Sequence, residues 1–112
     1  MGVAVFHVCY GVRREIDVDD SETMELLERR QHPWQLAARH HRMQSWWGQT
    51  IDEHRYFLLV GRIVGQFGWE HSSAAQLTDP EALALMTETA ENLRNAHIEV
   101  QPAWHFQFEP DR

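Results

Sequence analysis

The chain has 112 residues, ten of them basic and seventeen acidic, with a formal net charge of -7 and 43% hydrophobic residues. This length and apolar content suit a single domain, 1–112, and the negative charge excludes nucleic acid as a general partner because it repels phosphate backbones. Arg13 and Arg14 follow the apolar opening too soon for a signal peptide or a membrane span, so no membrane contact is expected.

The first predicted element is a strand over Val3–Tyr10, because β-branched and aromatic residues dominate it. Its apolar side chains occupy both parities, which is typical of a central strand covered on both faces. Asp19 with Glu22 three residues later forms a capping pattern, so a helix is predicted to begin near Asp20. Pro33 predicts a break in this helix, since proline disrupts a helix interior.

Helical spacing resumes after the break and predicts a second helical piece over Trp34–Trp47, ended by Gly48. The following apolar segment, Arg55–Trp69, is rich in β-branched residues and glycine and is predicted to be strand. Within it, Gly61-Arg62 is interpreted as the turn of a hairpin; in the alternative interpretation the glycines mark bulges in one longer bent strand.

The clearest helix start is at Thr78 or Asp79, where Glu81 completes a capping box and Pro80 fits the first turn. An apolar stripe at helical spacing then runs along this helix, consisting of Leu83, Met86, Ala90, Leu93 and His97. The last predicted element is a one-sided antiparallel strand, whose apolar parity comprises Ile98, Val100, Trp104, Phe106 and Phe108. His105 and Gln107 occupy its other parity, which is expected to face water.

The order β-α-β-β-α-β matches the ferredoxin-like arrangement, so the predicted fold is α+β, with helices on one face of an antiparallel sheet and the first helix broken near Pro33. The other face of the sheet is expected either to be solvated or to pack against a second copy of the chain. A homodimer formed through the sheet is therefore predicted as one state of the protein.

Eight histidines invite a metal site, but their spacing argues against one. His40 and His41 are adjacent and diverge on a helix, and no H-E-x-x-H pattern occurs. Cys9 is the single cysteine, so neither an intrachain disulfide nor a cysteine-built zinc site can form. We expect no metal and no cofactor, and an unpaired cysteine favours the cytoplasm.

Candidate catalytic residues lie where the strand over Arg55–Trp69 ends, at Glu70 and His71. A carboxylate that orients an imidazole is a general acid-base arrangement, although strand neighbours point to opposite faces and need a bulge or loop to cooperate. The glycines at 61, 65 and 68 do not form a phosphate loop, since the ending GK[ST] is missing.

Candidate binding residues gather around the second helical piece, because aromatic and arginine side chains anchor interfaces and stack on flat ligands. They are Trp46, Trp47, His40, His41 and Arg42, together with Trp69. These residues and the acidity predict a small binding protein, such as an inhibitor, an immunity protein or a regulator, with a basic protein as partner. The alternative is a small dimeric enzyme that uses His71 with Glu70, or else His40 and His41, for acid-base chemistry in a pocket walled by Trp69 and Trp46.

Overall fold

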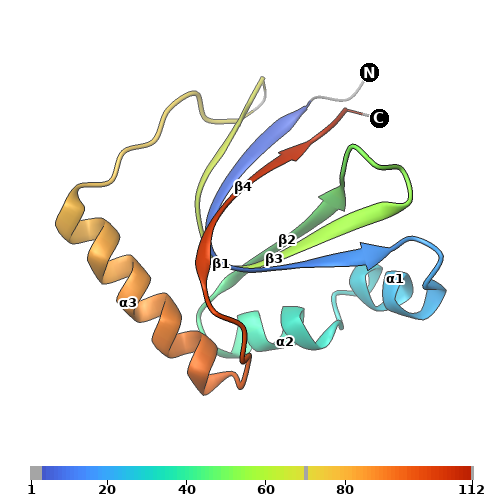
Figure 1. Ribbon diagram of the computed structural model, residues 1–112, viewed down its shortest axis with the longest axis horizontal. Helices are drawn as coiled ribbons and strands as arrows, with labels where there is room; N and C mark the ends of the chain where they lie inside the picture. Colours follow the sequence, from blue (N-terminus) through green and yellow to red (C-terminus); the bar gives the residue numbers. More distant parts are fainter. Residues whose placement is uncertain (1–3, 70, 112) are drawn as a thin grey trace.

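A four-stranded antiparallel sheet forms the centre of the molecule, and in the described residues, 4–69 and 71–111, three helices accompany it in the computed structural model (Figure 1). In chain order the elements are β1 (Val5–Asp17), α1 (Ser21–Glu28), α2 (Pro33–His40), β2 (Gln44–Gln49), β3 (Arg55–Gly68), α3 (Asp79–Asn95) and β4 (Ala103–Glu109). Across the sheet the strands are ordered β2-β3-β1-β4. The predicted α+β class and antiparallel sheet are confirmed.

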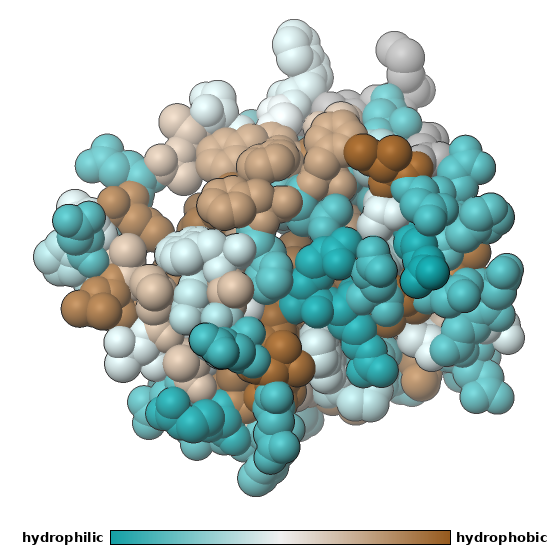
Figure 2. All heavy atoms as spheres, in the orientation of Figure 1, coloured by the Kyte–Doolittle hydropathy of each residue, from teal (hydrophilic) through white to brown (hydrophobic). Residues whose placement is uncertain are grey.

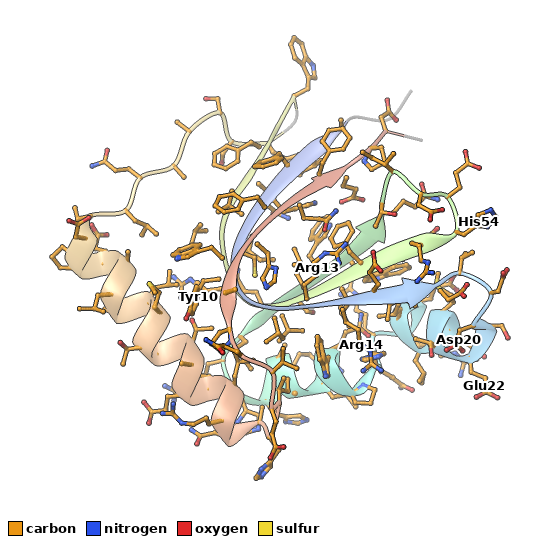
Figure 3. The ribbon with its side chains drawn as sticks, in the orientation of Figure 1. Tyr10, Arg13, Arg14, Asp20, Glu22 and His54 are labelled. Atoms are coloured by element: carbon orange, nitrogen blue, oxygen red, sulfur yellow. The ribbon has the colours of Figure 1, made fainter. Side chains whose placement is uncertain are left out.

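The first strand, β1, is central as predicted, because β3 pairs with one side of it and β4 with the other. It continues past Tyr10 to Asp17, where Val12 and Ile16 are buried and the polar residues 13–15 lie between them. Figure 3 shows Arg13 and Arg14 on opposite faces of β1, as strand alternation requires. The Arg14 guanidinium lies 5.6 Å from the ring centroid of Trp34 in α2, so the even-numbered residues of β1 face the helices.

The predicted break at Pro33 separates α1 from α2. Asp20 caps α1 by accepting a hydrogen bond from the Thr23 backbone N–H, one residue later than the cap expected at Asp19. His32 caps α2 in the same way, because its Nδ1 accepts from the Trp34 N–H at 3.0 Å, and Pro33 occupies the first turn, where no N–H is needed.

The prediction that α2 continues to Trp47 is wrong. The helix ends at His40, and Arg42 adopts the left-handed conformation with φ 59°, which turns the chain out of the helix. The next residues form β2, which pairs with β3 from Gln44 opposite Gly61 to Gln49 opposite Tyr56. A short aromatic segment is compatible with a helix or with a strand. It forms a strand here because it pairs with the edge of β3 that β1 does not cover.

The hairpin predicted at Gly61-Arg62 is also wrong, and the alternative of one long bent strand is right. Gly61 lies inside β3 with φ 149°, directly opposite Gly11 of β1. A Cβ on Gly11 would collide with the Val60 carbonyl, so both glycines are needed where the two backbones approach. The register also shifts between Val8 and Cys9, which adds a bulge to the same pair of strands.

The sheet is strongly curled, so that its helix-free face closes on itself. Through the pairing of β2 with β3 and of β3 with β1, Gly48 lies across from the C-terminal end of β1. Glu109 of β4 pairs with Val5, at the N-terminal end of β1. A flat sheet would separate these two positions by about 30 Å, yet a Cβ on Gly48 would lie 2.5 Å from the Glu109 carboxylate. Figure 1 shows the bend in β1.

Two cores result from this shape. On the helix side, buried strand residues pack against α1, α2 and the end of α3; the cluster contains Val12, Ile16, Leu27, Ala38, Leu58, Val60, Leu93 and Ile98. On the concave side, Cys9, Phe57 and Leu59 are fully buried with Trp46 and Ile63 against them. No described helix covers the concave side, and these residues are buried among the strands that curl around them.

The last helix, α3, begins with the predicted capping box, in which Thr78 and Glu81 satisfy each other's backbone N–H groups. Only its C-terminal part is anchored, with Thr89 and Leu93 buried. Leu83 at the other end is exposed, so the predicted stripe contacts the core only in part. Figure 1 shows α3 leaning away from the upper strands, which leaves part of the helix side of the sheet uncovered.

Candidate functional site

One polar side chain from each strand meets inside the curled sheet, and we call these four residues the strand clamp: His7, Trp46, Gln66 and Glu109. The Glu109 carboxylate oxygen Oε1 lies 2.8 Å from His7 Nε2 and accepts a hydrogen bond of 2.9 Å from Trp46 Nε1. Gln66 Nε2 lies 3.2 Å from His7 Nδ1. Because an amide nitrogen can only donate, Nδ1 is the acceptor and Nε2 carries the proton given to Glu109.

The carboxylate of the strand clamp is stabilised in its charged form. Burial raises the pKa of Glu109, but hydrogen bonds from His7 and Trp46 and the electrostatic influence of the His7 and His71 side chains lower it more, so its pKa lies below the ordinary value. The strand clamp therefore holds an anion between the two edges of the sheet.

The strand clamp resembles an acid-base pair in composition but lacks the access that catalysis requires. His7 is 0% exposed, and both of its ring nitrogens are occupied by Glu109 and Gln66. An imidazole in this position has no free nitrogen with which to take a proton from a substrate. The arrangement closes the sheet and satisfies buried polar groups.

Of the two predicted catalytic residues, Glu70 lies outside the described residues. His71 is exposed and lines an open groove of about 840 Å³ that Trp46 and Gln66 also line. Trp69, expected as a wall of the same pocket, does not line this groove. The structure thus places His71 near the strand clamp without bringing it into hydrogen-bond contact with a described carboxylate.

The predicted binding residues do not form one surface. His40 and Arg42 are exposed where α2 ends, with His41 half-buried between them. Trp69 is 89% exposed just after β3. Trp46 and Trp47 are strand neighbours, so Trp46 packs in the concave core while Trp47 packs on the helix side against Tyr56.

A gathering of exposed and half-buried apolar side chains, most of them aromatic, lies elsewhere, on the helix side of the sheet beyond α3. We call it the aromatic face; its residues are Phe6, Val8, Phe67, Trp104, Phe106 and Phe108, which share one side because they pair across β3, β1 and β4. Phe106 is 66% exposed, and its ring centroid lies 6.5 Å from that of Phe6. Figure 2 shows apolar side chains gathered over these strands.

The orientation of β4 is the reverse of the expected one, in which its polar side chains face water. The polar parity turns inward, where His105 contacts the Gly11 carbonyl at 3.2 Å and Gln107 accepts a 2.7 Å hydrogen bond from Arg13. The apolar parity faces outward, with Phe106 and Phe108 exposed. The alternation of polar and apolar residues divided β4 into its two faces correctly. The curl of the sheet, however, places the polar face inside.

A hollow of about 340 Å³ indents the aromatic face. Val8, Phe67, Trp104 and Phe106 line it from the strands, and the segment before α3 completes the wall with Ala75, Gln76 and Leu77. Its lining is almost entirely apolar, which suits an inserted side chain of a partner rather than a polar substrate.

Comparison with known proteins finds no matching family model, no significantly similar curated protein and no significantly similar solved structure. Within residues 4–69 and 71–111, no group of three or more His, Cys, Asp or Glu side chains is placed to hold a metal ion. In the same part of the chain, no helix is both long and apolar enough to cross a bilayer. The aromatic face is therefore identified as the candidate site from its own exposed side chains and hollow, and not from a similar protein.

Proposed function

We propose that this protein is a non-catalytic binding protein that presents the aromatic face to a protein partner. The observation that carries the proposal is the exposure of three neighbouring phenylalanines, 39% for Phe6, 66% for Phe106 and 42% for Phe108. Since a full aromatic side chain buries about 200 Å², these three rings alone offer about 300 Å² of apolar surface. Apolar patches of that size on a monomer are often functional.

The charge around the aromatic face favours a basic partner. The segment 71–111, which supplies α3 and β4, carries one arginine, Arg94, against six carboxylates outside the strand clamp: Asp79, Glu81, Glu88, Glu91, Glu99 and Asp111. A basic protein is attracted by this field, whereas a second copy of the chain brings like charges together. We therefore favour a basic protein over the homodimer as the occupant of this face.

The test is co-purification of the tagged protein from its source cells, with wild type, Phe106→Ser and the control Leu26→Ser, which alters an exposed leucine on α1. Phe106 offers about 130 Å² at about 25 cal/mol per Å², so its loss should weaken binding by about 3 kcal/mol, or roughly 100-fold. We expect a stoichiometric basic protein with wild type and Leu26→Ser, and its loss with Phe106→Ser. A partner unaffected by Phe106→Ser overturns the proposal.

Sedimentation of the purified protein separates the basic partner from self-association. A monomer supports the proposal, and a dimer that Phe106→Ser dissociates shows that a second copy occupies the face instead. For the fold, we propose the ferredoxin-like arrangement, supported by the strand order β2-β3-β1-β4 and the chain order of strands and helices. We also propose a cytoplasmic location, supported by the free thiol of Cys9.

A further inference from the structure

A second hollow, of about 400 Å³, lies beside β2, the edge strand opposite β4. Its walls come from the connection between the first two helices, from α2 and from β2; the lining residues are Arg30, Gln35, Arg39, Ser45, Trp46 and Trp47. We call it the arginine–tryptophan hollow. Its volume falls in the range of small-molecule sites, about 300–1,000 Å³.

The charge of this hollow is opposite to that of the whole molecule. Two arginines and no carboxylate line it, in a protein with a net charge of -7. Arg13, Arg29 and Arg55 each lie within ion-pair distance of a glutamate. Within the described part of the chain, neither Arg30 nor Arg39 has such a partner, so their positive charge is left for a ligand.

The other polar groups around the hollow are also donors. The Ser45 hydroxyl and the Trp47 indole N–H make no hydrogen bond to any described residue, so both remain free to donate. Gln35 is different, because its amide donates to the Leu27 carbonyl and accepts from the His32 N–H. Gln35 therefore fixes the wall, while the free groups select an acceptor-rich anion.

We propose that the arginine–tryptophan hollow binds a small aromatic carboxylate. Arg30 and Arg39 pair with the carboxylate, since guanidinium groups match its two oxygens, and the ring packs against Trp47, whose side chain lies on the helix side of β2. This site is separate from the aromatic face, because it lies at the opposite edge of the sheet and involves a different set of side chains.

The probe is 2-naphthoate, with 2-naphthamide as the uncharged match, titrated by calorimetry and by the indole N–H signals in NMR spectra. We expect naphthoate to shift the Trp47 signal, assigned with Trp47→Phe, and naphthamide to bind at least about tenfold more weakly. Arg39→Gln should weaken naphthoate about tenfold, whereas Arg94→Gln, an exposed arginine on α3, should leave its affinity unchanged.

Three results would overturn the proposal: equal binding of naphthoate and naphthamide, equal effects of Arg39→Gln and Arg94→Gln, or no indole shift up to about 10 mM ligand, the weak end of small-ligand affinities. Both variants change exposed side chains, so circular dichroism should show that each folds as the wild type does.

Discussion

Replacing Glu109 by alanine removes the acceptor that joins β4 to β1 and β2. His7 Nε2 and Trp46 Nε1 both donate to the same carboxylate oxygen, so two donors lose their partner in one substitution. A buried donor left without an acceptor costs about 1–3 kcal/mol. The Glu109 side chain is 24% exposed, so water replaces part of the loss, and we expect a destabilisation of about 2–4 kcal/mol.

Urea denaturation followed by tryptophan fluorescence measures this change as a shift in midpoint. Glu99→Ala is the matched control, because Glu99 is exposed and its side chain has no hydrogen-bond or ion-pair partner in the described structure. That control should change stability by less than about 0.5 kcal/mol. If Glu109→Ala were no more destabilising than Glu99→Ala, the strand clamp would not hold the sheet closed.

The strand clamp also predicts the direction in which the stability of the fold changes with pH. The pKa of Glu109 is lowered in the folded protein from its ordinary 4.5, so the unfolded chain binds the proton more readily. The stabilisation is therefore complete above about pH 4.5 and is lost as the pH falls through the lower folded value. Glu109→Gln, which cannot titrate, should show a shallower loss of stability below that pH than wild type.

Two further predictions concern the bend and the concave core. Gly61→Ala places a side chain at φ 149°, with its Cβ against the Tyr10 carbonyl, and should destabilise the fold by about 3 kcal/mol or more in the same urea assay, whereas a neutral effect would mean that the strands can part at this point. Burial raises the pKa of the Cys9 thiol to about 12, so a thiol reagent at pH 8 should modify it only as fast as the protein opens; rapid labelling of the folded protein would contradict the closed concave core.

Sequence patterns predicted what depends on neighbouring residues. The capping box at Thr78 and Glu81 and the break at Pro33 are local features, and both are present. The extent of α2 was predicted wrongly because Trp46 and Trp47 suit a helix or a strand, and only pairing with β3 distinguishes the two. The strand clamp escaped prediction because His7 and Glu109 are 102 residues apart, and no local signal links them.

The sequence by itself determined the α+β class, the central position of the first strand and the division of the last strand into a polar and an apolar side. Which of those sides faces water was decided by the tertiary structure. Where Gly11 opposes Gly61 the sheet bends, its helix-free face closes around Cys9 and Phe57, and the aromatic side of β4 is left outside. Alternation identifies two faces, but only the curvature of the whole sheet sets which of them is inside.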